Sequence, residues 1–277
     1  MVLSTAEIEK LSLELVGWDE VPGDSAVYVP GEELETALVG IDLESPEVQL
    51  AHQEGYDLAL AHHPAGESAR LNFVDVLDTQ VEFMVEHGVP KARAEEAIED
   101  LRRNAAHGAH SSNFRHDPSV AELLGQPYMN VHLAADEIGR RAFVEVVEAL
   151  SEDATVADLK DAFDEEFPEI REAPTDIETR VGRDDNELGT VAVHHAAGTN
   201  GGSEVARAYF EHGVDTVIYI HVSGNDTKAL REEFGDEKNL VITGHIASDA
   251  IGMNVLIEAL EDEGLECTRF SGLTLGV

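Results

Sequence analysis

Two strand–helix–strand patterns, far apart in the chain, constrain the fold more than any other feature of the sequence. The first reads ALVGIDL, ESPEVQLAHQEG and YDLALAHHP over residues 37–64, and the second reads TVAVHHAAG, TNGGSEVARAYFEHG and VDTVIYIHV over residues 190–222. A strand, a helix and a second strand in about 30 residues are typical of a βαβ unit with parallel strands. The junctions QEGYDLALAHH and EHGVDTVIYIH also resemble each other. The sequence therefore predicts an α/β fold with two βαβ-containing lobes of pseudo-repeated architecture.

The segments outside these two units predict further helices and strands. Residues 4–16 begin with a Ser/Thr cap followed three residues later by Glu, which predicts an amphipathic helix. A long helix over 79–103, broken near Pro90, leads into NAAHGAHSSNFRHDP, which is polar and turn-like. The stretch 127–187 contains one strand candidate and two helices, without obvious chemistry.

The last strand and helix, NLVITGHIASDAIGMNVLIEALEDEGLE, are expected to pack back onto the N-terminal lobe. We therefore expect residues 1–125 and 240–277 to form a metal-binding lobe and residues 126–239 to form the second lobe. No linker rich in Pro and Ser separates these pieces, so the lobes should share an interface. Ligands of α/β sheets bind at the carboxyl ends of strands, and we expect the site there, between the lobes.

The charge balance is strongly acidic. The chain has 57 acidic and 18 basic residues, a formal net charge of −39. Such a surface repels itself in dilute buffer, but at about 1 M salt the Debye length falls to roughly 3 Å. The composition is therefore typical of a protein from a salt-loving cell. It also argues against nucleic acid as a partner, because binding a polyanion depends on Lys and Arg, whereas divalent cations are attracted.

Targeting segments and cysteine content bear on where the protein acts and on which metal ligands it can offer. The start of the chain lacks the basic and apolar segments of a signal peptide, and no apolar run approaches the roughly 18 residues of a membrane span. We expect a cytoplasmic protein without a membrane partner. A single cysteine, Cys267, excludes an internal disulfide and a thiolate zinc cluster. Metal binding, if present, must use histidine and carboxylate.

The motif LALAHHP is the sharpest chemical feature, because an apolar strand ends there in His62 and His63. Neighbouring side chains on a strand point to opposite sides, so both imidazoles can reach metal only at the carboxyl end of the strand. A satisfied loop histidine is the alternative for each. The second feature is ITGHIASDAIG, in which His245 follows a strand and Asp249 lies four residues later. On a helix these two positions share a face, so one imidazole and one carboxylate can converge on a cation.

Two further histidine clusters leave alternatives open. The stretch AHGAHSSNFRHD holds His107, His110, His116 and Asp117, which either converge on a ligand or form a solvated polar loop. The pair His194 and His195 ends an apolar run before a Gly-rich turn. That turn matches neither a P-loop nor a dinucleotide motif, and a tight turn explains its glycines. No GxSxG motif occurs, and acidic neighbours should raise the pKa of Cys267, so any hydrolysis should use metal-activated water.

Taken in order, these segments resemble the NIF-three-like family, also called GTP cyclohydrolase I type 2 homologues. The matching pieces are GWDEVPG, the first βαβ unit with its HHP, NAAHGAHSSN, the second βαβ unit, and ITGHIASD, which together sample nearly the whole chain. The resemblance implies two divalent metal ions per subunit at the centre of an α/β fold, and a hollow homo-oligomeric ring, a hexamer. It also implies that this chain lacks the inserted domain of longer members.

The resemblance also implies a ligand set. His62, His63 and His245 carry over directly, His110 falls on the family's loop histidine, a possible catalytic residue, and Asp249 stands where the family has glutamate. The family places an aspartate four residues after the loop histidine. Phe114 occupies that spacing here, so either Asp117 or His116 replaces the missing ligand, and we favour Asp117.

Two function classes follow from these observations. The first is a metal-dependent hydrolase in which two ions activate a water against a nucleotide-like or phosphorylated small molecule, with GTP ring opening implied only by the family name. The second is a non-catalytic metal-binding or metal-buffering ring or scaffold. A third reading makes the histidines structural, without metal. His and carboxylate ligands suit Mn, Fe, Co, Ni and Zn alike, so the sequence does not select the metal.

Overall fold

The computed structural model describes residues 3–273, which divide into two compact units. The first unit contains residues 3–76, 104–138 and 249–273, and the second contains residues 77–103 and 139–248. One boundary follows Val76, and the other three fall within helices, namely α7 (Glu99–Ser111), α9 (Leu133–Ala149) and α14 (His245–Asp262).

Each unit is built on one mostly parallel sheet. The sheet of the first unit has the strand order β1-β4-β3-β2-β9, in which β2, β3, β4 and β9 are parallel and β1 is antiparallel to β4. The sheet of the second unit has the order β5-β8-β7-β6, in which only β5 is antiparallel. The strands are β1 (Ala26–Val29), β2 (Thr36–Gly40), β3 (Leu58–Ala61), β4 (Tyr128–Asn130), β5 (Glu178–Val181), β6 (Val191–Val193), β7 (Thr216–Tyr219), β8 (Asn239–Ile242) and β9 (Glu266–Phe270).

The strand orders confirm the predicted α/β class and pseudo-repeat. When β9 is left out, the first sheet has the order β1-β4-β3-β2, with the antiparallel strand at the edge. The second sheet has the equivalent order β5-β8-β7-β6. In both units the parallel strand next to the antiparallel edge strand leads into a long helix, β4 into α9 and β8 into α14. The two helices begin at equivalent topological positions.

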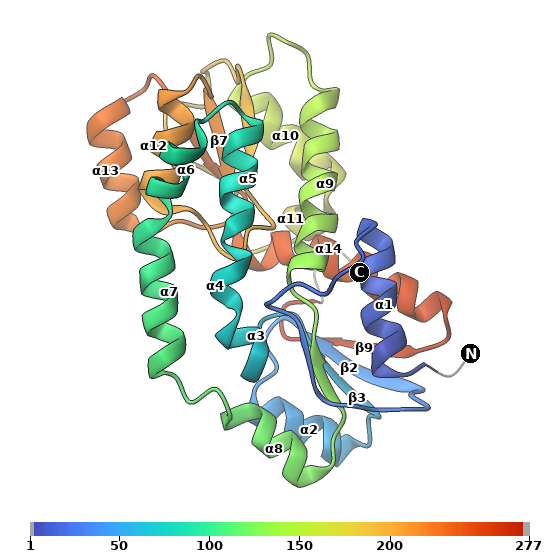
Figure 1. Ribbon diagram of the computed structural model, residues 1–277. Coiled ribbons are helices and arrows are strands. Elements are labelled where there is room, and N and C mark those ends of the chain that lie inside the picture. The colour runs from blue at the N-terminus through green and yellow to red at the C-terminus, as the bar shows by residue number, and fades with distance from the viewer. Residues whose placement is uncertain (1–2, 274–277) are drawn as a thin grey trace. The chain divides into compact units, whose positions relative to one another are not determined.

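Helices cover the sheets through apolar faces. In the first unit, α2 (Ser45–Glu54) and α8 (His116–Leu124) pack on one face through Val48, Ala51 and Ala121, which join a core with Leu38 and Tyr128 (Figure 1). In the second unit, a core lies between the sheet and four helices: α5 (Asp78–Glu86), α6 (Lys91–Ala97), α12 (Gly202–Glu211) and α13 (Gly224–Phe234).

The remaining helices are short or peripheral to these cores. They are α1 (Thr5–Val16), α3 (Glu67–Leu71), α4 (Phe73–Val76), α10 (Val156–Glu166) and α11 (Pro168–Arg171). The capping box predicted for the first helix is present, because the Ser4 hydroxyl accepts from the backbone of Glu7 and the Glu7 carboxylate accepts from the backbone of Ser4. In residues 3–273 no helix combines the length and apolarity needed to cross a bilayer.

The division of the chain differs from the predicted lobes at three places. Residues 77–103 belong to the second unit because α5 and α6 bury side chains in its core. Residues 126–138 belong to the first unit because β4 pairs with β3 and β1. Residues 240–248 belong to the second unit because β8 pairs with β7.

The polar stretch predicted as a loop is mostly helical. Its first half forms the end of α7, and its last three residues begin α8. Alanine favours helix strongly enough to offset the single Gly108. None of the side chains of α7 is buried, and the stretch from residue 104 lacks the large apolar side chains by which a helix is recognised in the sequence.

Candidate metal centre

His62 lies directly after β3, with none of its surface exposed. Its Nδ1 atom is 3.0 Å from the carbonyl oxygen of Val131. A carbonyl can only accept, so this contact places a proton on Nδ1, and the neutral imidazole then has its lone pair on Nε2. The imidazole is thereby presented as a ligand, with the outer nitrogen anchored by backbone.

His63 follows on the same loop and is oriented by a carboxylate. Its Nδ1 atom lies 2.7 Å from Oδ1 of Asp42, and its Nε2 atom lies 3.4 Å from Oδ2 of Asp249. Burial lowers the pKa of His63, but the contacts with Asp249 and Asp42 outweigh it, so the pKa is raised. A carboxylate on the outer nitrogen is the usual support of a metal-ligating histidine.

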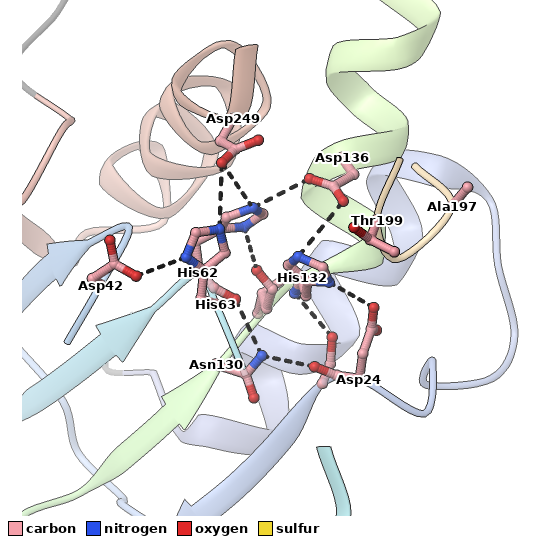
Figure 2. A network of polar contacts seen from close by, with 12 residues as sticks. Asp24, Asp42, His62, His63, Asn130, His132, Asp136, Ala197, Thr199 and Asp249 are labelled. Carbon is pink, nitrogen blue, oxygen red and sulfur yellow. Dashed lines mark hydrogen bonds and ion pairs between the residues drawn. The ribbon is translucent and has the colours of Figure 1, made fainter. Parts of the chain in front are cut away.

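Two buried carboxylates face these imidazoles from helices. Asp136 lies in the first turn of α9 and is 5% exposed, and Asp249 lies in α14 and is 2% exposed. Oδ1 of Asp136 is 3.2 Å from Nε2 of His62, and Oδ2 of Asp249 is 3.9 Å from the same nitrogen. Figure 2 shows both carboxylates pointing toward the histidine pair.

The contact between His62 and Asp136 is not a hydrogen bond. Nε2 of His62 is buried, and no group in residues 3–273 forms a hydrogen bond with it. In the tautomer set by Val131, Nε2 and the carboxylate oxygen both present lone pairs at 3.2 Å. Two buried acceptors at this distance repel each other unless a proton or a metal cation lies between them.

A third imidazole completes the cluster. His132 lies between β4 and α9, with Nδ1 2.6 Å from Oδ2 of buried Asp24 and Nε2 3.8 Å from Oδ2 of Asp136. Burial lowers the pKa of His132, but Asp136 and Asp24 outweigh it and raise this pKa to about 9. Four carboxylates, those of Asp24, Asp42, Asp136 and Asp249, contact the three imidazoles. Bound protons or cations are needed to balance their charge.

These residues fit a divalent-metal site. The ligand atoms of His62, His63 and His132 lie within 4.8 Å of one another, and so do those of His62, Asp136 and Asp249. Metal bonds of about 2.0–2.2 Å to nitrogen and oxygen place neighbouring ligands about 3–4 Å apart, which small side-chain movements reach from here. Imidazole and carboxylate together suit borderline and hard divalent ions.

The loop carrying the histidines is anchored by Tyr28. The Tyr28 hydroxyl accepts from the backbone N–H of Ala65 at 2.9 Å and of Gly66 at 3.4 Å, and donates to Oδ1 of Asn130 at 2.6 Å. Burial raises the pKa of Tyr28 to about 12, so it stays protonated. Asn130 in turn donates to the carbonyl oxygens of Asp24 and His62. One buried network therefore positions both sides of the cluster.

The structure places the predicted site residues in three different ways. His62, His63 and Asp249 come together in the first unit. His245 is the first residue of α14, one turn before Asp249 on the same helix, and its ring lies 4.5 Å from that of His221 between centroids. His110 lies exposed on α7, outside the cluster.

Asp117, expected as a metal ligand, instead accepts hydrogen bonds at the start of α2. Its Oδ1 atom accepts from the backbone N–H of Ser45 at 3.0 Å and from the Ser45 hydroxyl at 2.6 Å. It thus satisfies a free N–H in the first turn of α2 and is not among the clustered residues. His116, the alternative, is exposed beside it.

Sequence reasoning missed Asp24, His132 and Asp136. The last two lie in a stretch that shows no obvious chemistry in the sequence alone. A usable signal was present, because His132 and Asp136 have the same four-residue spacing after a strand as His245 and Asp249. Asp24 carried no signal, since acidic residues occur throughout the chain.

The second histidine pair is structural in character. His194 and His195 are buried at the end of β6, and Nδ1 of His194 lies 3.1 Å from the Tyr209 hydroxyl. Burial, with His87 nearby, lowers the pKa of His194 to about 3, so it is neutral. It packs edge-on against the rings of Phe83 and Tyr209.

Fold and cluster together define an α/β protein with a buried group of histidines and aspartates that could hold metal. One solved structure, of a NIF3 superfamily protein from Sphaerobacter thermophilus, is 49% identical to this chain, with a TM-score of 0.95, over 99% of this chain and 100% of that one. The chain belongs to the NIF3 superfamily, which confirms the resemblance seen in the sequence.

More distant structures share the fold alone. Protein ybgI, titled as of unknown function, is 17% identical with a TM-score of 0.55, over 97% of this chain and 98% of that one. Reduced HcgD from Methanocaldococcus jannaschii is 12% identical with a TM-score of 0.57, over 97% and 99% of the two chains. No protein-family model and no curated protein matches the chain.

Proposed function

We propose that this protein binds two divalent metal ions and uses them to hydrolyse a nucleotide-like or phosphorylated small molecule. The observation that carries the metal binding is the pair of buried acceptors, Nε2 of His62 and Oδ1 of Asp136, 3.2 Å apart. A cation between them turns a repulsive contact into an attractive one. The proposed ligands are His62, His63, Asp136, His245 and Asp249.

Asp136 replaces Asp117 in this set for two reasons. Asp117 is already engaged with Ser45, whereas Asp136 faces His62. The family resemblance implies an aspartate four residues after a histidine near the metals, and His132 and Asp136 have that spacing. We therefore assign to His132 the place first given to His110.

The protein's own residues prepare the site for chemistry. When bound, divalent ions lower the pKa of a coordinated water and polarise the bond under attack. Asp42 and the Val131 carbonyl hold the tautomers of His63 and His62 that present Nε2. His132, with its pKa near 9 and Asp24 on its outer nitrogen, is placed to hold or donate a proton beside the cluster.

A non-catalytic metal-binding or metal-buffering role is the second candidate. The burial of His62, Asp136 and Asp249 favours it, because a closed ligand set retains an ion well but admits substrate poorly. The half-buried His63 favours the hydrolase instead, since it leaves one side of the cluster approachable. Turnover separates the two.

The test begins with metal content. Protein purified without a His-tag in molar KCl should contain well over about half an equivalent of Mn, Fe, Co, Ni or Zn per chain. Less than that would remove both candidates. A screen of nucleotides and phosphoesters with each metal then tests the hydrolase, and His63→Ala and Asp249→Ala should abolish turnover while circular dichroism shows a folded chain. No turnover in any combination would leave the buffering role.

Assembly into a homo-oligomeric ring is proposed from the family resemblance. Light scattering after size-exclusion chromatography in molar KCl should give six times the chain mass. A monomer under those conditions would contradict the ring without bearing on the metal site, because the clustered residues of the first unit come from one chain.

A further inference from the structure

A cavity of about 360 Å³ lies in the first unit next to α7. Its walls are Pro64, Arg70 and Phe73 on one side and small residues of α7, Ala105, Gly108 and Ala109, on the other. Ligand pockets for small molecules begin at about 300 Å³. The cavity therefore suits a compact organic molecule.

None of the residues that line this cavity is acidic. Three other cavities, on the second unit, are each lined by at least four carboxylates. In a chain of net charge −39, a cavity without carboxylates offers an anion a place where like-charge repulsion is locally low. Most of the surface, in contrast, would repel such a ligand.

Arg70 supplies the one charged group in the cavity wall. Its Nε atom donates to the carbonyl oxygen of Pro64 at 3.3 Å, which fixes the plane of the guanidinium. Arg70 forms no ion pair within residues 3–273, whereas Arg115 in the same unit bridges Glu67 and Glu122. A guanidinium held in place with its outer N–H groups available is suited to a phosphate or carboxylate.

The cavity also lies beside the metal cluster. Pro64 directly follows His63, and the ring of Phe73 lies 6.4 Å from the ring of His132 between centroids. Phe73 and Pro64 offer apolar surfaces against which a flat ring can pack. A molecule in this cavity would therefore extend from Arg70 toward the histidines.

We propose that this cavity is a substrate-binding site for a small molecule with an oxyanion, a phosphate or a carboxylate, on a flat apolar body. Arg70 binds the oxyanion, and Pro64 and Phe73 pack against the body. This inference rests on the proposed function, because it names the class of substrate that the proposed metal centre would act on. The binding itself does not require metal.

Calorimetry with phenylphosphonate, benzoate and phenol tests the site in molar KCl, on both metal-stripped and zinc-loaded protein. Phenylphosphonate cannot be turned over as an ester, and benzoate distinguishes a carboxylate site from a phosphate site. Phenylphosphonate or benzoate should bind, and Arg70→Gln should weaken that binding about tenfold or more, while phenol binding stays unchanged. The matched control Arg183→Gln removes an exposed arginine paired with Asp185 in the second unit and should have no effect.

A second variant guards against loss of fold. Ala109→Phe fills the cavity from α7 and should abolish binding of all three probes while metal content remains that of the wild type. Probes that bind only to zinc-loaded protein, or equally well to Arg70→Gln, would overturn the site. Absence of probe binding to the wild type would overturn it as well. Metal content measured in parallel reports on the proposed function separately, so the two can fail independently.

Discussion

Nε2 of His62 and Oδ1 of Asp136 lie 3.2 Å apart in a buried setting, and in the neutral tautomer with its proton on Nδ1, toward Val131, both atoms are acceptors. The two residues come from different elements, the end of β3 and the first turn of α9. Their approach costs free energy in the metal-free protein, through desolvation and repulsion. A bound cation recovers that cost.

Replacing Asp136 with Ala should reduce bound metal, and replacing Asp117 with Ala should not. Asp136 faces His62, so its loss removes a proposed ligand, and metal content by mass spectrometry should fall by about one equivalent. Asp117 satisfies the first turn of α2, so its loss should lower the free energy of unfolding by about 1–2 kcal/mol. Metal loss only in the Asp117 variant would return that residue to the ligand set.

The contrast between these aspartates shows how far sequence reasoning reaches. The βαβ units were predictable because apolar strands and their flanking turns are local patterns. His62, His63 and Asp249 were predictable because strand ends and the i, i+4 spacing on a helix are local too. The choice between Asp117 and Asp136 depends on which carboxylate the sheet brings to β3, and that is a long-range contact.

The same limit explains the errors around α7. Residues 104–111, its second half, are polar enough to predict a turn-like stretch, because none of the side chains of this helix is buried. His107 and His110 lie on this exposed helix, so their spacing reflects a solvated surface. The missed pair His132 and Asp136 could have been found from the pseudo-repeat, since it occupies after β4 the place of His245 and Asp249 after β8.

Tyr28→Phe should weaken metal binding by loosening the loop that follows His63. The substitution leaves the backbone N–H groups of Ala65 and Gly66 without their acceptor, at about 1–3 kcal/mol each when buried. We expect about a tenfold lower metal affinity, as for other residues that support ligands. The control Tyr219→Phe removes a comparable buried hydroxyl that donates to Gly202 in the second unit. It should lower stability without changing metal affinity, and equal losses in both variants would refute a positioning role for Tyr28.

The metal-free protein should lose stability as pH rises from about 6.5 to above 9. The pKa of His132 is raised from 6.5 to about 9 in the folded state, so the folded chain holds a proton that the unfolded chain releases. This contribution, about 3 kcal/mol, is complete below pH 6.5 and disappears as pH passes the folded pKa. His63, whose pKa is also raised, acts in the same direction.

Urea unfolding of metal-stripped protein between pH 6 and pH 10 measures this slope, and His132→Gln should reduce it. His194 does not interfere, because its pKa is lowered to about 3 and its contribution is instead lost as pH falls below 6.5. Metal loading should also flatten the slope, since a cation bound at Asp136 offsets part of the negative charge that raises the pKa of His132. An unchanged slope in the His132 variant would mean that the Asp24 and Asp136 carboxylates do not stabilise a charged imidazole.

Salt should stabilise the fold, because repulsion among acidic residues outweighs the exposed ion pairs. Exposed pairs such as Arg183 with Asp185 contribute little to stability and weaken as salt rises. The net charge of −39 acts in the opposite direction, since screening shortens the Debye length from about 10 Å at 0.1 M to about 3 Å at 1 M. Melting of metal-free protein should therefore rise by about 5 °C or more between these KCl concentrations. A further increase above 1 M KCl should raise the melting temperature less, because screening changes most at low salt. Sucrose at the same water activity controls for general solute effects and should give a smaller rise than KCl. A melting temperature independent of KCl would contradict the inference that this surface is adapted to salt.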